Sequence, residues 1–534
     1  NKGVTSYRYD MTGNCVGITN SIAVETSYGY NEATLRMEES VNGEDQKTQY
    51  SYDAIGRLTG VADEAGTITY TYDGNGNILT VSECLPDGSN TKISRTYDAL
   101  NRVTSYTDIY GQTISYTYDK AGNRSSMTYP DGSVCKYTVD KNGDLLKVTM
   151  DDKVEAQYTY DNTGRITKLT RGDGSVEQYQ YDKGGRLVGM EDTSAADTVL
   201  SQAVYGYNGY GEITTKEEKL IGDKASKNAN YCENASMEYN TENQLTAMNG
   251  KTITYDRNGN MVTGPLGEEE ATYTYDCRNR LIEVKTKTRT ISYTYDSENQ
   301  RVASSQNGKL ITYIHDSNVN LSQLIQENQA GTITKYIYGQ KLIVDECKGA
   351  KQYYHYNNLM STTLLTDESG AVLSTYHYGT YGELIDGDAT LTRFLYNGGE
   401  GVSTDDTGLY YMRARYYNVA IRRFINQDVT EGVPSNPETL NRYAYVEGNP
   451  INLTDPFGLS PTLNSHNWGQ TLLDLGGMIP GPIGMVCDFL STVHYIKKGD
   501  WGNAAMSAIS FLPVVGTAIA KVASGVKKVC QATG

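Results

Sequence analysis

The sequence predicts a mainly β protein in which repeated β-hairpins form a continuous wall, followed by a short α-helical C-terminal segment. The main observation is a unit built around Tyr-Asp that returns at steps of mostly 20 or 21 residues. A fixed interval of this size is typical of repeat architectures. The Asp of the unit stands at positions Asp53, Asp73, Asp98, Asp119, Asp140, Asp161, Asp182, Asp256, Asp276, Asp296 and Asp316.

Each repeat has the same internal order of residues. An alternating Tyr/Thr/Ser run leads into Tyr-Asp, followed by a turn ending in Gly or Asn, then Arg or Asn, then an apolar residue. Residues 51–58, 179–187 and 273–281 are close copies of this order. Alternation at period two predicts a strand, and the D-x-x-G segment predicts a tight turn. Each unit is therefore expected to be a β-hairpin.

The Tyr of the repeat is expected to be structural. A single two-stranded hairpin is marginally stable in water, so the units must bury their apolar positions against neighbouring hairpins. The chain has 46 Tyr and only 5 Phe. A Tyr ring supplies a large rigid contact area while its hydroxyl can still reach a hydrogen-bond partner. We therefore expect a wall with one face exposed to water.

Composition favours an extracellular or surface-delivered protein. The net charge of −17 and the pI near 4.9 argue against nucleic-acid binding by this region. The eight Cys are scattered singly and there are five His, without a C-x-x-C pair or a Cys/His cluster. We therefore expect no metal site and no cofactor. No other catalytic motif is recognisable around the His residues, and no Walker or dinucleotide-binding loop occurs.

The N-terminal end predicts that this sequence is a piece of a longer chain. It starts at Asn1 without a Met and reaches the pair Tyr9-Asp10 almost at once. No charged segment followed by an apolar run precedes the repeats, as a secretory signal would require. A targeting segment is expected upstream.

The pattern changes between about 336 and 459, and here the chain is identified as a member of the RHS/YD-repeat proteins. The residues that carry the resemblance are Y-Y-M-R-A-R-Y-Y at 410–417, R-F-I-N-Q-D at 423–428 and D-P-F-G-L at 455–459. This stretch resembles the RHS repeat-associated core domain. The implied organisation is a repeat wall over 1–345, a core domain over 346–459 and a helical pre-toxin linker over 460–534.

The resemblance implies both a shape and an activity. Members of the family form a hollow shell or barrel-like cocoon, a spiral of hairpins that encloses a C-terminal toxin polypeptide. Many cut themselves after the Leu of the D-P-x-G-L motif, which here is the bond between Leu459 and Ser460. The matching catalytic residues are Asp428, Asp455 and Arg423, the last placed to bias the protonation of the two acids or to fix their geometry.

The same acids fit the chemistry of peptide hydrolysis. One ionised carboxyl group must activate water, and one protonated group must polarise the carbonyl, as in pairs of carboxyls that share a proton. Pro456 and Gly458 would bend the chain so that the bond after Leu459 reaches the acids, although the same residues also occur in ordinary turns. The predicted enzyme is a single-turnover aspartic-type autoprotease.

One segment departs from the family pattern Y-Y-D-P-x-x-G-R-F. This chain has Y-Y-N-V-A-I-R-R-F at 416–424, so Asn418 stands at the position of a turn Asp, and the Pro and Gly are also lost. If that Asp takes part in catalysis, cleavage is slow or absent here.

The segment after Leu459 is small and apolar, and its spacing predicts short helices broken by Gly and Pro. The run 501–520 carries no charged residue and has about the length of a bilayer span. We favour a helical plug inside the shell over a membrane-active segment. No nuclease, deaminase or transferase pattern fits in 460–534, so the toxin domain is expected outside this sequence.

Two functions therefore remain open. The first is a toxin-encapsulating shell of bacterial competition or toxin delivery, secreted or held at the cell surface. Its expected partners are its own C-terminal toxin domain, an immunity protein and a secretion or delivery machinery. The second is a non-enzymatic, cell-wall-associated protein that binds surface glycans through Tyr and Asp rows. A cut after Leu459 distinguishes the first from the second.

Overall fold

The chain folds into long antiparallel sheets, as the repeats predict. The computed structural model describes residues 3–222, 235–319, 321–429, 437–459 and 462–463, and these contain strands and 3₁₀ turns but no α-helix. The first sheet has twenty strands, each paired with the next along the chain. Its strands are β1 (Ser6–Tyr9), β2 (Cys15–Thr19), β3 (Glu25–Tyr30), β4 (Met37–Val41), β5 (Lys47–Tyr52), β6 (Leu58–Asp63), β7 (Gly66–Tyr72), β8 (Ile78–Cys84), β9 (Asn90–Tyr97), β10 (Val103–Thr107), β11 (Thr113–Tyr118), β12 (Arg124–Thr128), β13 (Val134–Val139), β14 (Leu145–Met150), β15 (Lys153–Tyr160), β16 (Ile166–Arg171), β17 (Val176–Tyr181), β18 (Leu187–Thr193), β19 (Val199–Tyr207) and β20 (Ile213–Leu220).

A second sheet of thirteen strands continues the same pattern. Its strands are β24 (Thr254–Tyr255), β25 (Met261–Leu266), β26 (Glu269–Tyr275), β27 (Leu281–Lys285), β28 (Thr290–Tyr295), β29 (Arg301–Gln306), β30 (Lys309–Asp316), β31 (Gln323–Gln329), β32 (Thr332–Tyr338), β33 (Leu342–Cys347), β34 (Ala350–Tyr356), β35 (Thr362–Asp367) and β36 (Val372–Thr375). The expected boundary between repeats and core domain, at 345/346, falls inside β33, where this sheet is continuous.

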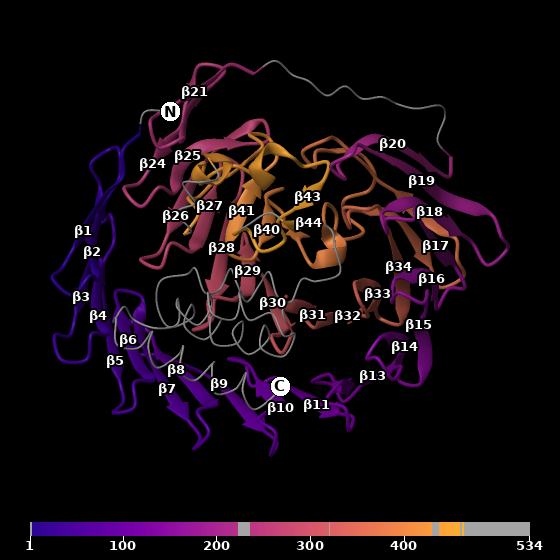
Figure 1. Ribbon diagram of the computed structural model, residues 1–534, viewed down its shortest axis with the longest axis horizontal. Coiled ribbons are helices and arrows are strands. Elements are labelled where there is room, and N and C mark those ends of the chain that lie inside the picture. Colours follow the sequence, from indigo (N-terminus) through magenta and orange to yellow (C-terminus); the bar gives the residue numbers. More distant parts are fainter. Residues whose placement is uncertain (1–2, 223–234, 320, 430–436, 460–461, 464–534) are drawn as a thin grey trace, which may run out of the picture.

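The remaining elements are short. They are β21 (Met237–Tyr239), β22 (Leu245–Met248), β23 (Lys251–Thr252), β37 (His377–Tyr378), β38 (Leu384–Asp386), η1 (Gly398–Glu400), β39 (Ser403–Thr404), β40 (Tyr410–Met412), β41 (Arg415–Asn418), β42 (Arg423–Phe424), η2 (Pro437–Leu440), η3 (Val446–Gly448), β43 (Leu453–Thr454) and β44 (Thr462–Leu463). The first sheet curves round in a wide arc, and the short strands β40–β44 lie inside that arc (Figure 1).

The residue order that recurs in each repeat has a local physical cause. Asp53 Oδ1 accepts hydrogen bonds from the backbone N–H groups of Ile55 and Arg57 at 3.1 and 2.9 Å, which closes the hairpin turn. Gly56 has a φ of 94°, a conformation that Gly adopts without a steric penalty. The Arg57 Nε atom lies 2.7 Å from Asp53 Oδ2. The Asp, Gly and Arg of the unit are therefore parts of one turn.

The Tyr of the following hairpin completes the unit. The Arg57 guanidinium lies over the Tyr72 ring, 4.6 Å from its centroid, and the Tyr72 hydroxyl donates to Leu58 O at 2.6 Å. Arg102 with Tyr118 and Arg165 with Tyr181 repeat the stacking at 4.5 and 4.6 Å. The Tyr thus gives ring contact and a hydrogen bond at once, as its preference over Phe predicts.

The two large sheets share one core and a row of charge pairs, most of them with at least one buried partner, which we call the seam. The core contains Ile93 and Ile114 from the first sheet together with Leu342 and Phe394. Every ion pair of the seam joins a residue of the first sheet or its turns to a residue of the second sheet or its turns. The pairs are Asp63 and Glu83 with Arg278, Arg95 with Glu298, Arg124 with Asp316, Asp131 with Lys335, Glu155 with Lys351, Glu177 with Lys341, and Asp192 with His355.

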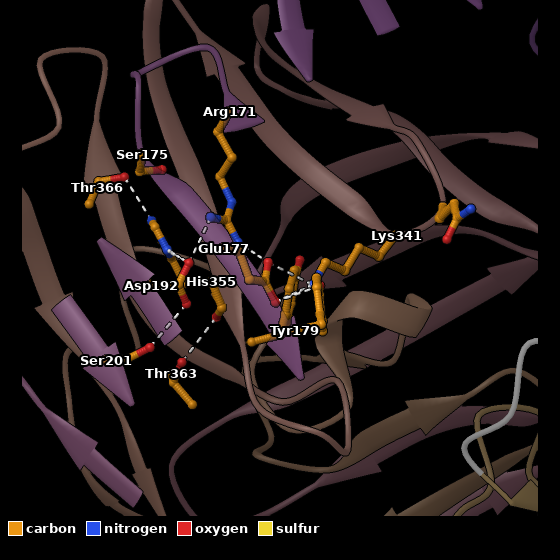
Figure 2. A network of polar contacts seen from close by, with 12 residues as sticks. Arg171, Ser175, Glu177, Tyr179, Asp192, Ser201, Lys341, His355, Thr363 and Thr366 are labelled. Carbon is orange, nitrogen blue, oxygen red and sulfur yellow. Dashed lines mark hydrogen bonds and ion pairs between the residues drawn. The ribbon is translucent and has the colours of Figure 1, made fainter. Parts of the chain in front are cut away.

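Figure 2 shows the densest part of the seam. The Arg171 guanidinium contacts both Glu177 and Asp192, and Lys341 Nζ lies 3.0 Å from Glu177. The His355 ring lies between Asp192 and Thr366, with contacts of 3.0 and 3.1 Å. Burial alone would raise the pKa of Asp192, but the charges of Arg171 and His355 hold it well below its usual range. The network therefore connects β16–β18 of the first sheet to β33–β35 of the second sheet.

The predicted helical linker at 460–534, with the uncharged run 501–520, lies outside the described residues except for 462–463, which form β44 instead of a helix. Within the described ranges, no helix has the length and apolar character needed to span a membrane. The five Cys that can be described carry no disulfide, and only Cys135 of these is fully buried.

Candidate functional site

The D-P-F-G-L segment forms the connection of a short hairpin. β43 and β44 pair in antiparallel fashion, so residues 455–459 lie in the connection between the two strands. Within this connection the Gly458 N–H donates to Asp455 O at 3.2 Å, and the Leu459 N–H donates to Asp455 Oδ1 at 3.0 Å. Asp455 therefore closes the turn with both its main chain and its side chain. Its carboxyl group lies beside the residue after which a cut is expected.

Gly458 is required by the close approach of a second hairpin. It has a φ of 67°, and a Cβ atom at this position would lie 2.8 Å from Met412 O and 3.1 Å from Arg415 N. Both contacts are shorter than ordinary van der Waals packing allows. The bend that Pro456 and Gly458 predict is therefore present, and it is fitted against the tip of the β40–β41 hairpin.

That tip binds three consecutive carbonyl groups of the turn. Arg413 Nη1 donates to Pro456 O at 2.6 Å, the Ala414 N–H donates to Phe457 O at 3.1 Å, and Arg415 Nε donates to Gly458 O. The chain is thus held at every residue from 456 to 458. An intramolecular reaction at the nearby bond after Leu459 would need such fixed positioning.

Arg415 also brings the two predicted acids together. Its Nη2 atom lies 2.8 Å from Asp428 Oδ2 and 3.4 Å from Asp455 Oδ2. All three side chains are buried, with exposed fractions of 3% for Arg415, 7% for Asp428 and 1% for Asp455. The guanidinium also lies over the Phe424 ring, 3.6 Å from its centroid. Burial lowers the pKa of Arg415, and the two aspartates oppose this effect.

Arg423 has other contacts. Its Nη2 atom donates to Asn243 O at 2.6 Å and to Asn441 Oδ1 at 3.1 Å, and its guanidinium lies over the Tyr239 and Tyr443 rings. In the described part of the chain, the guanidinium that contacts both acids belongs to Arg415. Arg415 was not among the residues predicted from the sequence, although it belongs to the R-A-R at the centre of the Y-Y-M-R-A-R-Y-Y motif.

Asn418, which stands at the family's turn Asp, is a turn residue here. Its Oδ1 atom accepts from the Ala420 N–H at 3.0 Å, and its amide donates to Pro265 O at 2.7 Å. Ser460, the residue after the expected cut, lies outside the described residues. The structure therefore describes Asp428, Asp455 and Leu459 but not Ser460.

A cavity of about 250 Å³ lies beside the turn. Phe457 of the turn lines it, together with Arg413, Gly401, Arg301 and His315. Burial and the charges of Arg301 and Arg413 lower the pKa of His315 to about 3. Its lining is mostly apolar, with a few charged and polar side chains, and the space is large enough for several water molecules. In the described part of the chain no group of His, Cys, Asp and Glu has the arrangement of a metal site.

Two family models match the chain. The model described as "Teneurin YD-shell" matches residues 216–451, and the model described as "RHS Repeat" matches residues 52–89, 93–134 and 139–176. Among curated proteins, the tRNA3(Ser)-specific nuclease WapA of Bacillus spizizenii is 29% identical over 276 residues, which is 50% of this chain and 11% of that protein. The toxin subunit YenC2 of Yersinia entomophaga is 35% identical over 112 residues, 20% of this chain and 11% of the relative.

Solved structures share the fold. The Tc holotoxin pore of Photorhabdus luminescens has a TM-score of 0.62 at 18% identity and covers 86% of this chain and 28% of its own. The crystal structure of TcdB2-TccC3-Cdc42 has a TM-score of 0.57 at 18% identity, over 85% of this chain and 28% of its own. The chain thus spans about a tenth of the length of the curated relatives.

Proposed function

This chain is an RHS/YD-repeat shell protein, and from that premise we propose that it forms part of a container for a C-terminal toxin polypeptide and cuts itself after Leu459. The self-cleavage is supported by two observations. The β40–β41 tip hydrogen-bonds to residues 456–458, and Arg415 contacts both Asp428 and Asp455 at the same turn.

The names of the relatives support the toxin half. Those named above are a nuclease and a toxin subunit. The cargo would be the toxin domain of the same polypeptide. An immunity protein against that toxin and a delivery or secretion machinery are the further partners of the proposal, with the container secreted or delivered from a bacterium.

The cleavage half follows from the positions of the acids. Water adds its oxygen to the Leu459 carbonyl carbon and gives one proton to a carboxylate, for which Asp428 is the candidate. The bond from Leu459 to the Ser460 nitrogen breaks, and that nitrogen takes a proton delivered by Asp455. Asp455 is placed for this role because its Oδ1 atom accepts a hydrogen bond from the N–H of Leu459, the residue whose carbonyl is attacked. Arg415 aligns both acids with charge-assisted contacts, the role that the resemblance assigned to Arg423.

Asn418 does not weaken this proposal. Its side-chain contacts are those of a turn residue, to Ala420 and Pro265. The family's Asp at this position is therefore replaced by a residue that closes the same turn, while Asp428 and Asp455 supply the two carboxyl groups.

Intact-mass measurement of the purified chain tests the proposal. We expect the parent to yield a fragment ending at Leu459, and Asp428→Asn and Asp455→Asn to remain whole. Asp388→Asn, in an exposed loop, is the control and should be cut like the parent. A single uncut mass for the parent would refute the autoprotease, and would favour the non-enzymatic, glycan-binding alternative.

A further inference from the structure

A third acid lies at the cleavage turn. Glu400 is the last residue of η1, and both oxygens of its carboxyl group are buried. No N–H group in the described part of the chain donates a hydrogen bond to either oxygen, and the Thr454 side chain faces the carboxyl. Thr454 directly precedes Asp455. Glu400 therefore stands next to the acid that closes the turn.

A cation is close to Glu400 but is not paired with its carboxyl group. Arg413 donates to Pro456 O at 2.6 Å, to Ser322 O at 2.9 Å and to the main-chain oxygen of Glu400 at 2.8 Å. Its donors are thus used on carbonyl groups. A buried carboxylate without N–H donors is strongly disfavoured, so the neutral acid is the favoured form.

The charged groups that face Glu400 agree with this. They are Arg413, from the β40–β41 tip, and Asp455, after β43. Burial raises the pKa of Glu400 to about 8 against the opposing charge of Arg413, and the negative charge of Asp455 adds to the rise. Neighbouring carboxyl groups that repel each other titrate as a pair.

The Asp428–Asp455 pair differs from this arrangement. Arg415 contacts both of its carboxyl groups and so compensates their mutual repulsion. The proton that hydrolysis needs is therefore better held on the other side of Asp455.

We propose that Glu400 and Asp455 share one proton beside the turn, and that Glu400 holds this proton at neutral pH. Its role in cleavage rests on the proposed function. In that reaction Asp428 takes one proton from the attacking water, and the shared proton passes through Asp455 to the Ser460 nitrogen as the C–N bond breaks. The proton on Asp428 then restores the pair. Glu400 acts through Asp455 and is a positioning residue.

The sharing is tested in the uncut protein, with Asp428→Asn as the background. Infrared spectra of chain labelled with ¹³C at the Glu carboxyls should contain a carboxylic-acid band that disappears with a midpoint near pH 8 and is absent when Glu400→Gln is added. Adding Asp455→Asn should move this midpoint to lower pH, because the neighbouring charge is gone. No such band, or an unchanged midpoint in the Asp455→Asn variant, would overturn the proposal.

The role in cleavage is tested by the pH dependence of the cutting rate. A merely structural Glu400 would be replaced well by Gln, which is neutral and of the same size. We expect Glu400→Gln to cut at least tenfold more slowly at pH 7 and to lose the fall in rate around pH 8, and Glu400→Asp to recover part of the rate. Parent-like cutting by Glu400→Gln would overturn the role. If the parent itself is not cut, the proposed function fails while the infrared titration still decides the sharing.

Discussion

The Nη2 atom of Arg415 lies 2.8 Å from Oδ2 of Asp428, although thirteen positions separate them in the chain. The same nitrogen reaches Asp455 at 3.4 Å, and Arg415 Nε donates to Gly458 O. One guanidinium therefore joins the segment after β42 to the turn that precedes Leu459. A change at this side chain acts on both acids and on the turn together.

Replacing Arg415 by Lys should slow cleavage at least tenfold. Lys keeps the positive charge but cannot make the forked contacts of a guanidinium, so the two acids and the turn lose their common anchor. We expect a stability loss of about 1–3 kcal/mol as well. The cutting rate is followed by intact mass and the stability by urea unfolding. Arg423→Lys is the matched control, and similar slowing in both variants would contradict the assignment to Arg415.

Replacing Gly458 by Ala should disturb the turn more than a positive φ alone explains. A Cβ atom would meet Met412 O at 2.8 Å and Arg415 N at 3.1 Å, so the grip of the β40–β41 tip must shift. We expect a loss of about 1–3 kcal/mol and slower cutting. Gly408→Ala provides the comparison, because Gly408 has a φ of 82° but open space around it. Equal cutting rates would count against the close fit.

Glu400 should make the parent less stable as the pH rises. The pKa of its carboxyl increases from 4.5 in the unfolded chain to about 8 in the folded protein. Between these values the folded state binds more protons, so the free energy of unfolding falls as the pH rises through this window and then levels off. Glu400→Gln removes this dependence and should gain relative to the parent by about 1.4 kcal/mol per pH unit at most. Urea unfolding at pH 5, 7 and 9 measures it, and parallel curves would contradict it.

Asp192→Asn should weaken the polar network that connects the two sheets. Asp192 Oδ1 lies 2.9 Å from Arg171 and 3.0 Å from His355, and removing its charge leaves the buried Arg171 guanidinium and the His355 ring with one charged partner fewer. We expect a loss of roughly 3–5 kcal/mol at pH 7. Because the pKa of Asp192 is held below its usual range, its contribution is present above pH 4 and is lost as the pH falls.

Unfolding is therefore monitored by circular dichroism at several pH values. The stability difference between Asp192→Asn and the parent should be largest near neutral pH and should shrink in acid. Asp152→Asn is the comparison, since Asp152 pairs with Lys136 on the surface. It should leave the unfolding transition nearly unchanged. A constant difference between Asp192→Asn and the parent at all pH values would refute the linkage.

Tyr72→Phe should isolate the hydroxyl of the repeat. The ring and its contact with Arg57 remain, but the 2.6 Å hydrogen bond to Leu58 O is lost. We expect the unfolding free energy to fall by about 1 kcal/mol, because the carbonyl loses a partner. Tyr210→Phe, at a ring that is 95% exposed, is the control. Equal melting temperatures for Tyr72→Phe and the parent would show that the hydroxyl is dispensable.

The repeat unit could be predicted from the sequence because its interactions are local. Asp53, Gly56 and Arg57 meet within one turn, and Tyr72 belongs to the next strand, so the residue order carries the geometry. The D-P-F-G-L turn was predicted for the same reason. Asp428 and Asp455 were chosen from the family resemblance, and the fold places both on one guanidinium.

The sequence by itself thus determined the hairpins, their antiparallel order and the turn before Leu459, all of which depend on neighbours within about one repeat. Only the tertiary structure decided that Arg415 and not Arg423 contacts the acids, that the tip at 413–415 grips 456–458, and that Glu400 lies beside Asp455. It also decided the seam that joins the two sheets. These contacts connect residues tens to hundreds of positions apart, and their energies depend on burial and on the curvature of the wall, which no local pattern encodes.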